Sequence, residues 1–185
     1  MITLYVLIGL LILIGIWIAL LYNGLVRADN VCEESWADID TELKRRYNLI
    51  PNLVETVKGY ARHERETLNE VIEARNRAMA STGSPESQSQ DENALVQGLR
   101  QIFALAESYP DLKANENFLD LQQALSNTED RIQTARRVYN ANVRNLNNRL
   151  EVFPSNLVAS GFGFRAREYF EVEDAAVREV PSVEF

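Results

Sequence analysis

The chain has 185 residues and a net charge of -8, and its length fits about one domain. Its acidic balance, with a pI near 4.8, lacks the basic face that a nucleic-acid-binding protein needs. One cysteine and one histidine exclude an intrachain disulfide, a CxxC metal site and any zinc or di-iron site that needs two histidines. We therefore expect no enzyme: no catalytic residue, no cofactor-binding residue, no cofactor and no metal ligand.

The N-terminal segment is apolar, and all 19 basic and 27 acidic residues follow Val26. The run from Ile2 to Leu21 would be about 30 Å long as a helix, which matches the hydrocarbon core of a bilayer. Trp17 and Tyr22 resemble aromatic residues at a membrane interface. The alternative is a cleaved signal peptide, which has basic residues before a shorter apolar core and a small-residue cleavage site. Since these features are absent from the run, residues 1–26 are predicted to be an uncleaved transmembrane helix and its junction.

The charges beside this helix predict its orientation. No Lys or Arg precedes the apolar run, whereas Arg27 follows it closely. Basic residues favour the cytoplasmic side of a membrane. We therefore predict a single-pass anchor with the N-terminus outside and the rest of the chain in the cytoplasm.

A long helix is predicted to continue from this anchor. Apolar residues recur at helical spacing along one stripe, formed by Trp36, Leu43, Ile50, Val57, Val71 and Ala78. No glycine or proline lies between Arg27 and Ile50, and the stripe resumes in phase after Pro51. We predict one uninterrupted helix from Ile2 to about Ala80, kinked at Pro51, where the ring removes a backbone donor.

A second helix is predicted after a short break. Gly83 suits the C-cap of the first helix, Ser84 an N-cap, and Pro85 the first helical position. The opening of this helix is polar and weakly patterned, but its later part carries a regular apolar stripe up to Tyr109. Pro110 is predicted to end it.

A third helix is predicted from the N-cap Asn115 to Leu150. Pro154-Ser155 either ends this helix or begins a short fourth helix through Ala159. The glycines that follow break the pattern, and residues 165–185 form an acidic tail that we expect to be extended or frayed.

These elements predict an all-α fold: an antiparallel three- to four-helix bundle with long helices on an N-terminal transmembrane helix. The expected divisions are residues 1–26, the bundle at 27–164 and the tail at 165–185. Because the first helix outruns the later ones, part of its stripe should remain uncovered. We expect that part to lie around Trp36 and Ile39 and to mediate homo-oligomerisation.

The basic triplet Lys44-Arg45-Arg46 invites a lipid-binding interpretation. Along a straight helix it would lie about 35 Å from Leu21, whereas screening at physiological salt acts over about 8 Å. We therefore expect a solvated face or pairing with acids on a neighbouring helix such as the third. A patch for a partner protein is the alternative.

Three other polar features have structural and functional interpretations. His63-Glu64 is half of a zinc motif without its second histidine, so we expect Glu64 to form a polar layer that fixes helix register, bonded to Tyr60 or to the third helix. Asn142 stands at an expected apolar position and is a candidate buried register residue. Tyr169-Phe170-Glu171 either docks on the bundle or forms a short motif for a partner protein.

Several long segments, in order and spacing, resemble the LemA family: SWADIDTELKRRYNLIPNLVETVKGYARHE, ALAESYPDLKANENFLDLQQALSNTEDRI, ARRVYN and FPSNLVASGFGFRAREYFE. The YNGLVRADNVCEESW junction and the anchor extend this resemblance over nearly the whole chain. It implies an antiparallel helical bundle, one membrane anchor with its N-terminus outside and a bacterial origin, but no established activity. Asn48 replaces the Asp that often precedes LIPNLVE in this family, so a role that needs a carboxylate there does not carry over.

These observations support three hypotheses. The first is a non-enzymatic scaffold or assembly protein of the bacterial inner membrane, which presents its bundle to partner membrane proteins or to copies of itself. The second is a membrane-remodelling or lipid-sensing protein, which a basic membrane-facing flank would favour and a magnetosome-associated relative suggests by analogy. The third is an enzyme or small-ligand protein with a pocket between helices, which a concave cluster of buried ionisable groups would favour.

Overall fold

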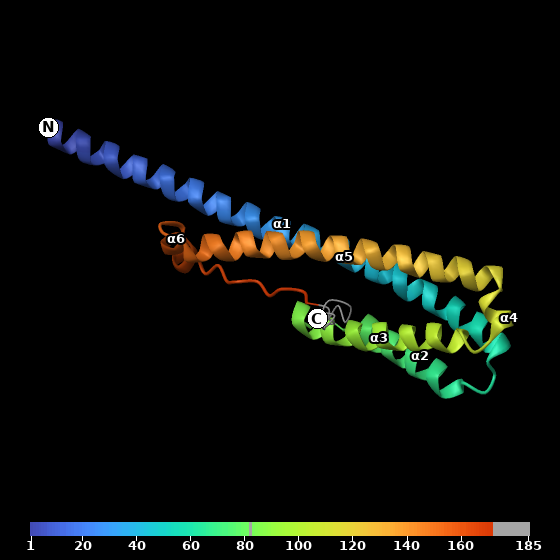
Figure 1. The fold of residues 1–185 in the computed structure, drawn as a ribbon. Helices are drawn as coiled ribbons and strands as arrows, with labels where there is room; N and C mark the ends of the chain where they lie inside the picture. The colour runs from blue at the N-terminus through green and yellow to red at the C-terminus, as the bar shows by residue number, and fades with distance from the viewer. Residues whose placement is uncertain (82, 172–185) are drawn as a thin grey trace, which may run out of the picture. The chain divides into compact units, whose positions relative to one another are not determined.

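The computed structural model describes residues 1–81 and 83–171, and every regular element in these ranges is a helix (Figure 1). In chain order the helices are α1 (Ile2–Tyr60), α2 (Arg65–Ala80), α3 (Pro85–Ala106), α4 (Pro110–Lys113), α5 (Glu116–Glu151) and α6 (Ser155–Phe162). The all-α prediction is confirmed. Of the predicted tail, residues 172–185 lie outside the described residues.

The chain divides into two compact units. Of the described residues, the first unit consists of Met1–Asp40 and Gln133–Glu168, and the second consists of Thr41–Ile132 and residues 169–171. Helices α1 and α5 therefore each contribute residues to both units. The candidate sites described below lie within one unit or the other.

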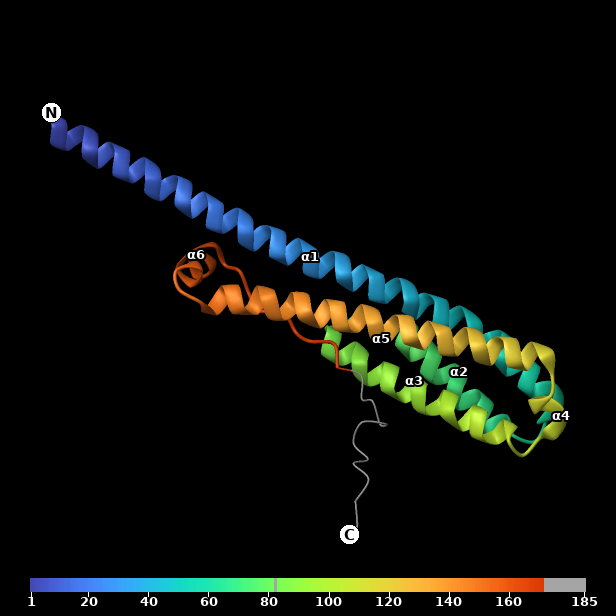
Figure 2. The same ribbon diagram turned by 45° about the horizontal axis from the view of Figure 1, so that its top comes forward.

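In the second unit the helices run back and forth (Figure 2). Arg75 of α2 donates its Nε–H to the backbone carbonyl of Tyr47 at 2.7 Å, so α2 returns along the end of α1. The Asn115 Nδ2 atom, just before α5, donates to the Tyr60 hydroxyl at the end of α1 at 3.0 Å. The apolar stripes of these helices form the core of the unit. Phe103 of α3 and Phe118 of α5 pack there with ring centroids 6.2 Å apart.

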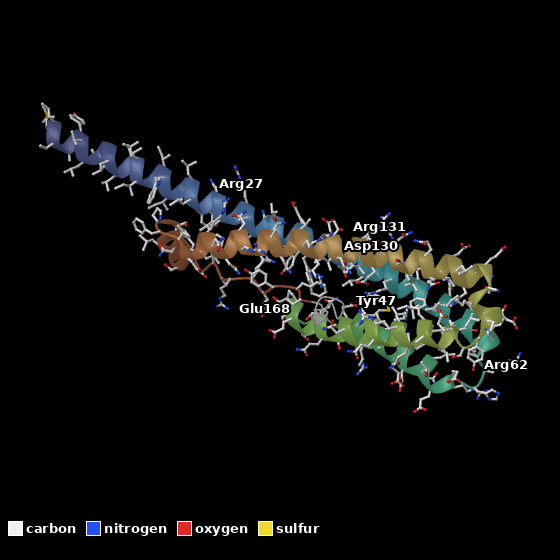
Figure 3. The ribbon with its side chains drawn as sticks, in the orientation of Figure 1. Arg27, Tyr47, Arg62, Asp130, Arg131 and Glu168 are labelled. Carbon is white, nitrogen blue, oxygen red and sulfur yellow. The ribbon has the colours of Figure 1, made fainter. Side chains whose placement is uncertain are left out.

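The predicted single helix to Ala80 is wrong beyond Tyr60. Helix α1 passes without a break through the junction after Val26 and through Pro51, but it ends at Tyr60. A turn over residues 61–64, marked by Arg62 in Figure 3, separates it from α2. Gly59 weakens the last turn of α1, because glycine disfavours a helix by about 1 kcal/mol relative to alanine.

The links on either side of α3 were partly predicted. Ser84 caps α3 through its side chain, which accepts from the Ser87 amide at 3.4 Å, and Pro85 occupies the first turn. Gly83 is not the left-handed cap of α2. That helix closes at Ser81, which has an extended backbone with φ -66° and ψ 113°, so the exit needs no glycine.

A different glycine in α3 has a packing role. A Cβ atom placed on Gly98 would lie 2.9 Å from the Cγ2 atom of Val71 in α2. That separation is too short for a normal contact, so α2 and α3 approach each other closely because residue 98 has no side chain.

In the first unit, α5 runs antiparallel to α1. Trp36 packs on Tyr139 with ring centroids 5.2 Å apart, and Arg149 donates to the Gly24 carbonyl at 3.2 Å. Ile39, expected to lie on an uncovered stripe, is 0% exposed. The expectation that the stripe is uncovered at Ile39 is therefore wrong, and homo-oligomerisation stays a prediction.

The predicted ends of the later helices, α4 to α6, agree more closely with the structure. The Asn115 side chain accepts from the Phe118 amide at 3.0 Å, as a cap of α5. Helix α3 ends at Ala106, before Pro110, and Pro110 begins the short α4. The short fourth helix is α6, and Gly163 ends it with φ 79°, a left-handed conformation that favours glycine.

Candidate functional site

The most unusual polar feature of the second unit is a buried ion pair. The side chains of Arg46 in α1 and Glu92 in α3 are 2% and 0% exposed, and Arg46 donates through Nη2 to the Glu92 carboxylate. The hydroxyl of Tyr47 donates to the other Glu92 oxygen. Arg46 Nη1 also contacts Glu129 of α5 at 2.7 Å, so this cluster, Arg46–Tyr47–Glu92–Glu129, joins three helices.

The charged groups of this cluster pair with one another. Burial and the neighbouring Glu92 carboxylate raise the pKa of the Tyr47 hydroxyl, so it remains a protonated donor at neutral pH. Each oxygen of Glu92 accepts a hydrogen bond, which offsets part of the cost of burying its charge. A general acid or base needs a titratable group that faces a substrate, and these groups face one another. The geometry favours a structural role that fixes which helix faces meet.

The basic triplet is therefore explained largely by pairing. Arg46 binds an acid on α5, the predicted third helix, which confirms that part of the expectation. Arg45 is half-exposed and pairs with Glu42 of its own helix at 3.0 Å. Glu92 was missed, although Gln88, Glu92, Leu95 and Leu99 share helical spacing and extend the apolar stripe of α3 into its polar opening.

Glu64 does not form a layer inside a helix. It lies in the turn before α2 and accepts from the Tyr109 hydroxyl, beyond the end of α3, at 3.2 Å. Tyr60 instead bonds to Asn115. His63 and Asn48 are exposed. The register prediction for Glu64 is wrong because the helix on which it depended ends at Tyr60.

The start of the predicted tail is held in the first unit by three side chains. Asn147 of α5 accepts from the Arg167 amide and donates to the Arg167 carbonyl, both at 3.0 Å. Arg167 also pairs with Asp29 of α1 at 2.6 Å, and Tyr139 donates to the Glu168 carbonyl at 2.9 Å. The segment is extended, as expected, and it is docked.

Two sequence-predicted residues at the end of α5 and in the tail have different outcomes. Asn142 is only half-buried, so the prediction of a buried register residue is wrong, and Asn147 makes the specific contacts instead. Phe170 is 0% exposed, which confirms docking for the Tyr169-Phe170-Glu171 segment.

The buried thiol beside this segment is unreactive by environment. Burial raises the pKa of Cys32, and the nearby Arg167 guanidinium only partly opposes this effect. The thiol therefore stays protonated at neutral pH, whereas a nucleophilic cysteine needs a depressed pKa and access to solvent. Burial likewise raises the pKa of Tyr139 to about 12, which keeps its hydroxyl a donor to the tail.

An apolar face surrounds the end of the N-terminal run. Leu25 forms a buried cluster with Val158 and Ala159 of α6, and Ile18, Leu21, Leu150 and Phe164 pack against it. The ring centroid of Tyr22 lies 4.9 Å from that of Phe162 and 5.7 Å from that of Phe164. Beside these rings a shallow groove of about 500 Å³ is lined by Tyr22, Val26, Asp29 and residues 162–167.

The groove offers few groups for catalysis. Its acid, Asp29, is paired with Arg167, one of the two arginines that line the groove. Across residues 1–81 and 83–171, no three His, Cys, Asp or Glu side chains are grouped so that they could hold a metal ion. The arrangement is suited to contact with an apolar or interfacial environment.

Helix α1 is also the one described helix that is long and apolar enough to cross a membrane. No residue of its most apolar stretch is fully buried inside the structure. Arg27 is the first charged side chain after this stretch (Figure 3).

Curated relatives include "Protein LemA" of Metamycoplasma hominis, which is 26% identical over 138 residues. That alignment covers 74% of this chain and 63% of the relative. "Magnetosome protein MamQ 2" of Paramagnetospirillum magneticum is 25% identical over 180 residues, covering 83% of this chain and 66% of that protein. "Magnetosome protein MamQ" of Magnetospirillum gryphiswaldense is 24% identical over 180 residues, with the same coverage.

The chain spans slightly less than two thirds of the length of these relatives. The LemA family model matches residues 35–185, which include the C-terminal part of α1 and all of α2 to α6. The chain belongs to the LemA family.

Proposed function

We propose that this chain is a membrane-anchored, non-enzymatic scaffold or assembly protein, which presents its helical body to partner membrane proteins or to copies of itself. The observation that carries the proposal is the apolar start of α1, which is mostly exposed, has no fully buried residue in its most apolar stretch and is long enough to span a bilayer. A segment that exposes so much apolar surface needs a lipid environment.

The arrangement of the ionisable groups supports a role without catalysis. The most deeply buried charges, Arg46 and Glu92, bind each other. The thiol of Cys32 is buried and protonated. A scaffold needs a stable shape and exposed faces, which a helical body with paired internal charges provides.

The proposed location is the bacterial inner membrane, with the body in the cytoplasm and the N-terminus outside. Arg27 supports this orientation from the sequence. The fold adds Arg149, which bonds to Gly24, and Arg167, which bonds to Asp29, near the same end of the apolar run. Cationic side chains at this level favour the anionic lipids of a cytoplasmic leaflet.

This topology predicts opposite labelling at two sites. In a Cys32→Ala background, we expect Thr3→Cys to react with a membrane-impermeant maleimide in intact cells. Asp38→Cys is exposed in the structure and should react only after the membrane is opened. Labelling of Asp38→Cys alone in intact cells would show that the body lies outside the cytoplasm. Labelling at neither site, or at both sites, before lysis would contradict a spanning anchor with exposed flanks.

Self-association remains part of the proposal, through a surface other than Trp36 and Ile39. Two apolar side chains on the exposed side of α5, Leu119 and Val138, are 45% and 50% exposed and mark faces open to a partner. We expect a photo-crosslinking amino acid at either site to give discrete adducts in cells, with a band at twice the chain's mass for self-association. The buried position Ile132 is the matched control. No adduct from either exposed site, or equal adducts from Ile132, would contradict a scaffold that uses these faces.

Membrane remodelling is the second candidate function, and one observation favours it. The segment that comes after α5 in the chain carries exposed apolar side chains, and it lies near the end of the apolar run of α1. Three relatives are named magnetosome proteins. The predicted adducts to partner proteins would favour the scaffold, whereas altered vesicle shape with the purified chain alone would favour remodelling.

A further inference from the structure

We propose that α6 and the loop before it form a second membrane-contacting element. They would lie in the interface of the same bilayer that α1 spans, with their exposed apolar side chains among the lipid acyl chains. The inference rests on the proposed membrane anchor and adds a site that the anchor alone does not require. Its occupant is the lipid bilayer.

The first argument is the exposed apolar surface itself. Four large side chains on one short stretch are 59% to 73% exposed: Val152, Phe153, Leu157 and Phe162. No charged residue occurs from Val152 to Phe164. Single exposed apolar residues are normal on a protein surface, but a dense group marks an interaction site or a membrane contact.

The second argument is the level at which α6 lies along α1. Its inner face, Val158 and Ala159, packs on Leu25, and Ile18 and Leu21 border this cluster. Ile18 and Leu21 belong to the apolar run, so a bilayer around that run reaches α6 as well. An element fixed at that depth contacts lipid on its outer face.

The third argument is the aromatic layer. Phe162 packs against Tyr22 in a tilted arrangement and Phe164 packs against it edge-on, and Trp17 is 45% exposed one residue before Ile18. Tyrosine and tryptophan are enriched at membrane–water interfaces, where an apolar ring body meets a polar edge. These rings place the boundary between lipid and water beside α6.

The charges that flank the uncharged stretch fit the same boundary. Arg149 precedes it, and Arg165 and Arg167 follow it, with Glu151 as the single acid between the first two arginines. Arg149 is tied to the Gly24 carbonyl, just beyond the apolar run. Arginines at such positions keep their head groups at the phosphate level while an apolar segment enters the interface.

Depth-dependent fluorescence quenching tests the inference on the full chain. In a Cys32→Ala background, an environment-sensitive fluorophore is attached at Leu157→Cys and the protein is reconstituted in phosphatidylethanolamine–phosphatidylglycerol vesicles. The vesicles contain phospholipids with a nitroxide at acyl carbon 5 or 12. Leu11→Cys, within the apolar run, and Asp38→Cys, exposed on the body, are the matched controls. We expect several-fold stronger quenching at Leu157 than at Asp38. The shallow nitroxide should be more effective at Leu157, and the deep one at Leu11.

The two proposals fail in different ways. Quenching at Leu11 without quenching at Leu157 would overturn the membrane contact of α6 and leave the anchor intact. No quenching at Leu11 would overturn the anchor itself. Phe153→Cys, which is even more exposed, repeats the test at a second site. An unchanged far-UV circular dichroism spectrum excludes misfolding as the reason for a negative result.

Discussion

Replacing Glu92 by alanine is expected to lower the free energy of unfolding by about 3–5 kcal/mol, because it leaves a charged partner buried and unpaired. Arg46 is 2% exposed and would lose the acceptor of its Nη2 group, and Tyr47 would lose the acceptor of its hydroxyl. For a chain of this size, each kcal/mol corresponds to a fall in Tm of about 2–4 °C. Heating the full chain in mild detergent and following helix content by circular dichroism measures the effect.

Two further variants separate the loss of a partner from the value of the pair. Glu129→Ala removes the acid at the rim, whose side chain is 33% exposed, and should cost about 1 kcal/mol or less. Arg46→Met combined with Glu92→Leu removes both charges and should recover most of the stability lost in Glu92→Ala. Equal effects of Glu92→Ala and Glu129→Ala, or no recovery in the double variant, would contradict the structural role of the cluster.

This cluster illustrates what a periodic pattern leaves undetermined. The spacing of apolar residues indicates which face of a helix is buried. A polar residue on that face cannot be told from a solvent-exposed residue by the sequence pattern alone. Gln88, Ser89 and Glu92 are buried at the opening of α3, in the stretch whose pattern looked weak. The basic triplet on α1 was a second sign, since Arg46 lies on the same turn as the buried Tyr47. The choice between Glu92 and the other acids needs the three-dimensional contact.

The end of α1 was missed for a related reason. Ala61 is 1% exposed inside the turn, and Leu68 and Val71 resume the stripe in α2, so periodicity alone does not reveal the reversal. Gly59 and the polar residues of the turn were the available signals. By contrast, the caps at Ser84 and Asn115 were predictable, because their side chains act on amides only three residues away.

The missed reversal also changed the functional prediction. A single long helix would have left part of its apolar stripe without a partner, and that surplus suggested an oligomer interface. The return of α2 covers residues on the distal half of the stripe in the second unit, while Tyr139 of α5 covers Trp36 in the first. Outside the apolar run, most of the exposed apolar surface of the first unit lies around α6. The apolar pattern of α6 is too short to predict this surface from the sequence.

Replacing Phe170 by alanine is expected to cost about 3–5 kcal/mol, the usual range for removing a fully buried phenylalanine. Its side chain is 0% exposed although it belongs to an extended segment without helical periodicity. Alanine would leave a cavity at this buried site, because close-packed neighbours relax only partly around a smaller side chain. Thermal unfolding followed by circular dichroism should show the loss as a lower Tm. The neighbouring Tyr169→Ala, at a site that is 37% exposed, is the matched control and should change stability by less than about 1 kcal/mol. An unchanged Tm in Phe170→Ala, or equal losses in the two variants, would show that the segment does not pack in solution as the structure places it. Either result would favour the alternative interpretation of this segment as a free motif for a partner protein.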